Sequence, residues 1–289
     1  MESDPPSGAK MGTHLVAPTR WKVICAYHGK DFFGWQSQPN RRCVQDVVTE
    51  VLTGILRQKI VVHGSSRTDT GVHARGFVFH FDAAWRHPPE RLLAACRTRL
   101  PPDVFFHRVQ AVGPDFHARF SARRKQYIYY LKEGPADPFE APYCWGVKGT
   151  LDPKLMQEAA NHLIGCHDFA AYSAFPGHAR LSTVRNVSRL DVRKKGRQVR
   201  IIAEADGFLY KMVRSLVGGL AKVGQGILVP EVLAEVLASR ERTALIPTAP
   251  PQGLFLEKVI YREWKGTAGE TFCGEKGSVK TGMAQPGKE

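Results

Sequence analysis

The residues best suited to chemistry gather in one polar turn, residues 64–75. Within this turn Arg67, Asp69 and His73 supply a guanidinium, a carboxylate and an imidazole. A carboxylate can act as a nucleophile or as a general base, and the sequence leaves these two roles open. The alternative is ordinary turn chemistry, because an aspartate two residues before a glycine is common in turns and Arg67 could be its surface partner.

A second segment, residues 116–130, alternates basic and aromatic side chains. Arg123, Arg124 and Lys125 stand directly before the tyrosine-rich part that begins near Tyr127. Basic groups bind backbone phosphates, and aromatic rings stack on unpaired bases. A strand with a solvated basic face would explain the three cations, but it explains the tyrosines less well. The segment therefore favours contact with a nucleic acid and shifts the interpretation of Asp69 toward a carboxylate that acts on a nucleotide.

A third candidate lies on an expected helix at residues 208–223, whose apolar residues form one stripe. Arg214 falls at the flank of this stripe, and Lys211 lies in the same segment. A guanidinium in this position could hold a carboxylate through a bidentate pair. The alternative is a solvated helix arginine.

The charge of the chain points to a polyanionic partner. Lysine and arginine number 41 against 27 aspartates and glutamates, which gives a net charge of +14 and a pI near 9.7. The last residues, from 265 onward, are nearly neutral, so the surplus belongs to the expected folded body. An excess of this size is typical of proteins that bind nucleic acids.

The cysteines and the apolar runs indicate the cellular setting. Six cysteines are scattered without a C-x-x-C pair, which favours free thiols in a reducing compartment. No apolar run reaches the length of a membrane span, and the first residues match neither a secretory signal nor a transit peptide. We expect a cytoplasmic protein without membrane contact, and an organellar home stays open for a eukaryotic source.

Hydrophobic periodicity predicts the same order of elements twice. In the first half strands are expected at 21–27, 59–63, 77–82 and 104–112, with helices at 44–56 and 88–96. In the second half we expect strands at 126–132, 183–193, 198–205 and 255–261, and helices at 152–163, 208–223 and 230–238. The predicted fold class is α+β, with two ferredoxin-like (β-α-β-β-α-β) halves that share a mostly antiparallel sheet and leave a central cleft.

The expected domain boundaries follow from this order. Residues 1–20 form a disordered leader, 21–112 the first half with Asp69, 113–264 the second half, and 265–289 a disordered tail.

Familiar cofactor motifs are missing from the sequence. It contains no G-x-x-x-x-G-K-[ST] loop, and the glycines of Gly224–Gly226 are interpreted as the end of a helix. The eleven histidines show no H-x-x-x-H pair beside a cysteine cluster. We therefore expect no cofactor and no metal, and chemistry that depends on side chains alone.

The residues resemble those of the TruA family of tRNA pseudouridine synthases, from about Lys22 to Tyr261. The matching segments, in family order, are Gly34–Gln38, Arg67–Ala74, Asp115–Phe120, Gly207–Arg214 with Val223–Gly226, and Gly253–Leu256. Two places depart from the family pattern: His28 stands where aspartate is usual, and Ser65-Ser66 replace the usual small pair.

The resemblance implies a function and a set of roles. The expected reaction is the conversion of uridine to pseudouridine at positions 38, 39 and 40 of the tRNA anticodon stem-loop, by a homodimer. Asp69 would be the catalytic aspartate, and the target base must flip out of its stack to be reached. Arg67 would occupy the vacated position, Tyr127 would stack on the uracil, Arg214 would pair with Asp69, and Leu256 would pack against the base. His73 is interpreted as structural support.

Two rival functions remain at this stage. One is a non-catalytic RNA-binding paralogue of the same fold, which would need the basic surface but not the carboxylate. The other is a metal-dependent nuclease that uses Asp31, Asp69 and Asp103, although no two of these share a short motif. Arg123, Arg124, Lys125 and Lys211 are candidate RNA contacts under the first rival as well as under the synthase hypothesis.

Overall fold

The structure is a computed structural model that describes residues 17–174 and 182–261. Most of the expected leader and all of the expected tail lie outside the described residues. The α+β class is confirmed, with helices and mostly antiparallel strands in the described chain. The described residues form two compact units: unit 1 contains 17–122 and 251–261, and unit 2 contains 123–250.

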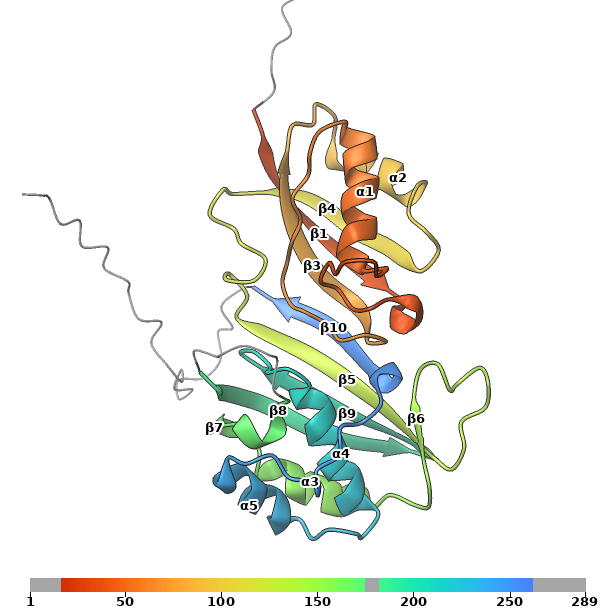
Figure 1. Ribbon diagram of the computed structural model, residues 1–289, viewed down its shortest axis with the longest axis vertical. Coiled ribbons are helices and arrows are strands. Elements are labelled where there is room, and N and C mark those ends of the chain that lie inside the picture. The colour runs from red at the N-terminus through yellow and green to blue at the C-terminus, as the bar shows by residue number, and fades with distance from the viewer. Residues whose placement is uncertain (1–16, 175–181, 262–289) are drawn as a thin grey trace, which may run out of the picture. The chain divides into compact units, whose positions relative to one another are not determined.

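Unit 1 is built around three long strands that appear in Figure 1 as β4, β1 and β3, side by side in that order. Both β1 pairings are antiparallel, and helices α1 and α2 contact each other. The elements of unit 1 are β1 Thr19–Tyr27, η1 Gly29–Asp31, α1 Val44–Leu56, β2 His63–Gly64, β3 His73–Ala83, α2 Pro89–Arg97, β4 Val104–Val112, η3 Pro251–Gly253 and β10 Leu254–Ile260.

The second strand is shorter than the expected 59–63. Only His63 and Gly64 pair with β3, near its C-terminal end, opposite His80 and Phe79. Ile60 and Val62 are buried but do not pair with β3. Their apolar side chains therefore reflect burial in the core and not membership of a strand.

Strand β10 pairs with the opposite end of β3. Phe255 lies opposite His73, and Leu256 lies opposite Ala74, in a parallel pairing. The segment 251–261 therefore groups with unit 1, whereas the sequence periodicity assigned its strand to the second half. Strand β2 ends at Gly64, opposite Phe79, so this edge of β3 is open to β10 near His73.

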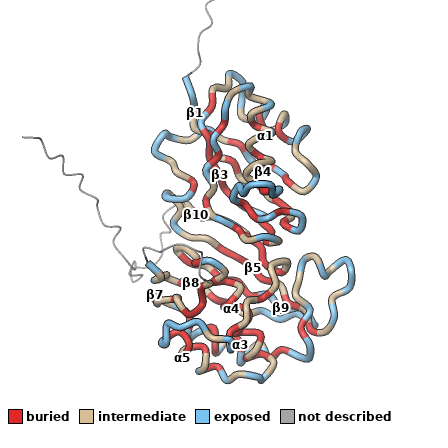
Figure 2. The backbone as a smooth tube through the Cα atoms, viewed as in Figure 1, coloured by how far each residue is buried: buried red, intermediate tan, exposed pale blue. Residues whose placement is uncertain are grey.

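Strand β3 is buried on both faces, which the alternation of Phe77, Phe79 and Phe81 does not reveal. These rings are fully buried, and on the opposite face His80 is only 2% exposed. The segment after β4 covers that opposite face, because the backbone N–H of Ala118 donates to Nδ1 of His80 at 3.1 Å. Figure 2 shows the buried colour along β3.

We expect the folded state to lose stability as the pH falls from about 6.5 toward 4. Burial lowers the pKa of His80 to about 4, and His117, His63 and Arg20 add to this effect while Asp82 opposes it. Between these pH values the unfolded chain binds more protons, so the free energy of unfolding decreases by about 2 kcal/mol. Urea unfolding at pH 7.5 and pH 5 measures the loss.

The matched variant for this test is His80→Asn, which does not titrate and keeps an acceptor near the position of Nδ1. It should show a smaller loss between the two pH values than the wild type. His162→Asn, at an exposed histidine, should leave the loss unchanged. An unaltered pH dependence in His80→Asn would show that His80 is not its source.

Unit 2 contains a sheet in the order β5, β9, β8, β7, in which neighbouring strands are antiparallel, and the short β6 pairs with β5 in parallel. Its elements, visible in the lower half of Figure 1, are β5 Arg124–Glu133, β6 Trp145–Val147, α3 Pro153–Asn161, β7 Gly165–Asp168, η2 Ala170–Tyr172, β8 Val184–Lys195, β9 Gln198–Ala205, α4 Met212–Gly224 and α5 Glu231–Ser239.

Helix α4 begins four residues later than its apolar stripe predicts. Lys211 has a left-handed backbone, with φ of 60°, and the turn before it keeps residues 208–211 out of the helix. The helix ends at Gly224, which confirms that the Gly224–Gly226 segment ends a helix.

Four cysteines that the structure describes are free thiols: Cys25, Cys43, Cys96 and Cys144. Among the described residues, no helix is both long and apolar enough to span a membrane.

Candidate active site

Asp69 lies in the loop between β2 and β3 and is half-buried, while Arg67 in the same loop is exposed. The backbone carbonyl of Asp69 accepts a hydrogen bond from the N–H of Val72 at 3.1 Å, which closes a tight turn. The carboxylate therefore projects from a short, backbone-bonded turn and not from a helix or a strand.

The loop after β1 holds this turn through backbone contacts. The N–H of Trp35 donates to the carbonyl of Thr68 at 3.3 Å, and the N–H of Gly71 donates to the carbonyl of Phe32 at 3.3 Å. Gly34 has a φ of +86°, and a Cβ at this residue would lie 2.3 Å from the Thr68 oxygen. The Gly34–Gln38 motif thus lies directly against the turn that carries Asp69.

His73 connects the end of the turn to the same loop. It is 1% exposed, its Nδ1 accepts the backbone N–H of Gly29 at 3.0 Å, and its ring stacks on Phe255 at 4.6 Å. Nδ1 carries no proton in this arrangement, because it accepts a hydrogen bond. These contacts are those of a structural support for the turn.

Leu256 is fully buried on β10, beside the start of β3, where it lies opposite Ala74. The structure thus brings Leu256 into the same unit as Asp69 and Arg67. The other sequence-predicted site residues, Tyr127, Arg214, Arg123, Arg124, Lys125 and Lys211, belong to unit 2.

In unit 2, Tyr127 is 7% exposed on β5, and its ring meets the ring of Phe208 edge to face at 5.2 Å. Arg214 on α4 is half-buried, and its Nε donates to the carbonyl of Ala249 at 2.7 Å. The N–H of Ala249 donates back to the Arg214 carbonyl at 3.0 Å. This pair of hydrogen bonds fixes the direction in which the guanidinium leaves the helix.

Tyr129 lies two residues from Tyr127 on the same strand, and its hydroxyl donates to the carbonyl of Pro250 at 2.8 Å. Burial raises the pKa of Tyr129 above its usual range, and the positive charge of Arg214 partly opposes this increase. The phenol therefore remains protonated at neutral pH and serves as a donor.

The basic residues predicted to contact RNA differ in their surroundings. Arg123 is exposed, while Arg124 is half-buried and lies 3.5 Å from Glu204. Lys125 and Lys211 are half-buried, and the Lys211 ammonium lies 5.0 Å from the centre of the Tyr210 ring. Arg123 is therefore the most accessible of the four.

Sequence reasoning missed Tyr27 and Thr68 as parts of the site. Their hydroxyls form a buried hydrogen bond of 2.8 Å, and Thr68 directly precedes Asp69 in the chain. Thr68 belongs to the turn at residues 64–75 that the sequence singles out. Its hydrogen bond to Tyr27 could not be predicted, because two residues 41 apart in the chain leave no periodic pattern.

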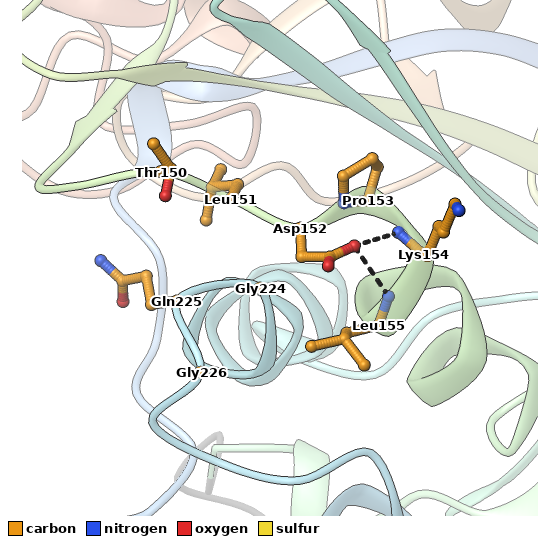
Figure 3. Close-up of a pocket in the computed structure, with 9 residues that line it drawn as sticks. All are labelled: Thr150, Leu151, Asp152, Pro153, Lys154, Leu155, Gly224, Gln225 and Gly226. Atoms are coloured by element: carbon orange, nitrogen blue, oxygen red, sulfur yellow. Dashed lines mark hydrogen bonds between the residues drawn. The ribbon is translucent and has the colours of Figure 1, made fainter.

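A surface hollow of about 580 Å³ lies in unit 2, away from all these residues in the sequence. Figure 3 shows its wall, where the Asp152 carboxylate accepts the N–H groups of Lys154 and Leu155 at 2.7 and 3.3 Å. The carboxylate caps the start of α3 and so occupies the N–H groups that could otherwise hold an anion.

In the part of the chain that the structure describes, no group of three or more His, Cys, Asp or Glu residues is arranged to hold a metal ion.

Comparison of the sequence with known proteins identifies the family of this chain. A family model described as tRNA pseudouridine synthase matches residues 23–121 and 159–262. Proteins named tRNA pseudouridine synthase A from Thermoanaerobacter sp. (strain X514) and Brevibacillus brevis are 39% and 40% identical to this chain, over 83% and 84% of it and 98% and 99% of their own lengths. The relative of that name from Methylocella silvestris is 39% identical, over 84% of this chain and 99% of its own length.

Among solved structures, the crystal structure of a Cbf5-Nop10-Gar1 complex matches 69% of this chain and 54% of its own chain, with 12% identity and a TM-score of 0.30. A score this low supports no statement about function. The family match and the relatives cover most of the chain at high identity, and they confirm the expectation of an isomerase that followed from the motifs. The chain belongs to the tRNA pseudouridine synthase family.

Proposed function

We propose that this chain converts uridine to pseudouridine at positions 38, 39 and 40 of the tRNA anticodon stem-loop, with Asp69 as the catalytic carboxylate. The observation that carries the proposal is the turn around Asp69, whose backbone is fixed by hydrogen bonds from Trp35 and Val72 while the residue stays partly exposed. A fixed and accessible carboxylate is what a nucleophile or general base requires.

The chemistry is an isomerisation in which atoms balance without a cofactor. The bond between C1′ of the ribose and N1 of the uracil breaks, and a bond between C1′ and C5 forms. C5 loses its proton and N1 gains one. In the proposal the uridine flips out of its stack before reaction, and Arg67, exposed beside Asp69, takes the vacated position.

The remaining roles are proposed from the family motifs. Leu256 packs against the flipped base, and Tyr127 stacks on it. The pairing of Arg214 with Asp69 stays a prediction. The high net charge of +14 supports a tRNA partner, and the proposal includes a homodimer in the cytoplasm.

Mapping pseudouridine in unmodified tRNA transcripts tests the proposal. The transcripts carry uridine at position 38, 39 or 40, and matched transcripts carry cytidine at the same position. We expect modification wherever one of these uridines is present, with or without EDTA. Tight binding without any product would favour the non-catalytic RNA-binding paralogue, and strand cleavage that EDTA abolishes would favour the nuclease.

A charge reversal tests whether the start of β5 contacts RNA. Lys125→Glu should weaken binding by a similar factor for every tRNA sequence, because phosphate contacts carry no sequence information. The slope of log K against log salt should become shallower by about 1. Filter binding at several salt concentrations measures both effects. Lys154→Glu, at an exposed lysine of α3, is the control. Unchanged affinity in Lys125→Glu would remove this strand from the RNA-binding surface.

A further inference from the structure

Thr68, the residue directly before Asp69, is held at both its backbone and its side chain. It is 7% exposed, and its carbonyl accepts the N–H of Trp35 at 3.3 Å. Its Oγ1 lies 2.8 Å from the hydroxyl oxygen of Tyr27, in a buried hydrogen bond that either hydroxyl can donate. The peptide plane that leads into Asp69 is thus fixed from two sides.

Tyr27 is a rigid support for this hydrogen bond. Its backbone stands between two strands, opposite Ala74 of β3 and Val104 of β4. Its ring is 4% exposed and lies 5.7 Å from the ring of Phe77 and 6.3 Å from the ring of Trp35. The phenol therefore has little freedom, and its hydroxyl has a fixed position relative to the sheet of unit 1.

We propose that the hydroxyl pair of Tyr27 and Thr68 positions the carboxylate of Asp69, a role that rests on the proposed function of Asp69. The carbonyl of Asp69 is held by Val72 on the other side, so the backbone is fixed both before and after this residue. An aspartate side chain has only two torsions, and the location of its carboxylate follows its backbone closely. A displacement of about 1 Å can cost up to about 100-fold in rate.

The polarity of the pair supports positioning over simple packing. The ring of Tyr27 lies among Phe32, Trp35 and Phe77, where a phenylalanine would pack equally well. A buried hydroxyl is costly without a partner, and a hydrogen bond adds a direction that apolar contact lacks. The hydrogen bond between the two hydroxyls therefore fixes the direction in which the Thr68 side chain points.

The experiment compares variants by single-turnover rate at saturating enzyme, by tRNA affinity and by unfolding free energy. Tyr27→Phe and Thr68→Val should each lower the single-turnover rate about tenfold or more and leave tRNA affinity unchanged. Thr68→Ser keeps a hydroxyl and should restore most of the rate. The double variant should be no slower than either single variant, because both remove the same hydrogen bond.

The double variant also separates positioning from stability. Replacing both partners by apolar groups of the same shape leaves no unpaired buried hydroxyl, so its unfolding free energy should recover toward the wild-type value. The rate should stay low. Tyr172→Phe is the matched control, since it removes a buried phenol hydrogen bond, to the Leu233 carbonyl in unit 2, and should lower stability without changing the rate.

Two outcomes would overturn the inference. Wild-type rates in Tyr27→Phe and Thr68→Val would show that the hydroxyls do not position Asp69, and a double variant that regains the wild-type rate would show that packing alone suffices. Asp69→Asn, measured in parallel, keeps the two proposals apart. An inactive Asp69→Asn beside fully active hydroxyl variants refutes only the positioning role, whereas an active Asp69→Asn refutes the proposed function itself.

Discussion

Pseudouridine formation should fall by about 1,000-fold or more in Asp69→Asn and Asp69→Ala, while tRNA affinity stays within about threefold of the wild type. The carboxylate is proposed to act on the sugar or the ring, and neither amide nor methyl can replace it. The fixed turn should persist in both variants, because the backbone bonds from Trp35 and Val72 do not use the Asp69 side chain. Rates come from single-turnover assays on an unmodified transcript, and affinity comes from filter binding.

Asp46→Asn is the matched control for this experiment. Asp46 is also a half-buried aspartate of unit 1, in the first turn of α1, and no role in the reaction is proposed for it. It should keep the wild-type rate. Turnover that persists in Asp69→Asn would remove the aspartate from the mechanism, and a loss of affinity equal to the loss of rate would make it a binding residue.

The second large effect is expected for Gly34→Ala, which should lower the rate about 100-fold and the free energy of unfolding by about 3 kcal/mol. The new Cβ would lie 2.3 Å from the Thr68 carbonyl oxygen and 3.2 Å from the carbonyl carbon of Asp69. Both neighbours are backbone atoms, so the catalytic turn itself must move. The φ of +86° adds strain that any L-residue would feel.

Gly149→Ala is the control that introduces backbone strain without a steric clash. Gly149 has a φ of +78°, but a Cβ there meets nothing within 4 Å. It should cost only about 1 kcal/mol in unfolding free energy and leave the rate unchanged. If Gly34→Ala and Gly149→Ala had equal effects on both rate and stability, the close contact between Gly34 and the turn would not matter for the reaction. Chemical denaturation and single-turnover assays give the two measurements.

Much of the fold could be predicted because long elements carry periodic apolar patterns. Helix α1 and strands β4 and β9 have the bounds that the sequence predicts. Short strands such as β6 and β7 could not be predicted, because three or four residues give no measurable period. The late start of α4 depends on the left-handed Lys211, a backbone state that the sequence pattern does not report.

The sequence could identify the residues of the candidate site from their side-chain types and from the order of the motifs. Asp69 stood out because an ordinary turn needs no carboxylate together with a guanidinium and an imidazole, and the family motifs then assigned its neighbours. The support beneath it was not predictable, since it depends on contacts between residues far apart in the chain. Tyr27 reaches Thr68, and Gly29 reaches His73, only once β1 and β3 have paired.

The pairing of β10 with β3 has a consequence for how the chain is made. Unit 1 is discontinuous in sequence, because residues 123–250 separate its first part from the segment 251–261. During synthesis the first 122 residues leave the ribosome long before the segment 251–261, so β3 is made well before the strand β10 that pairs with it. Unit 2 can form meanwhile from a continuous stretch. The N-terminal unit, which is made first, is therefore the last to be completed.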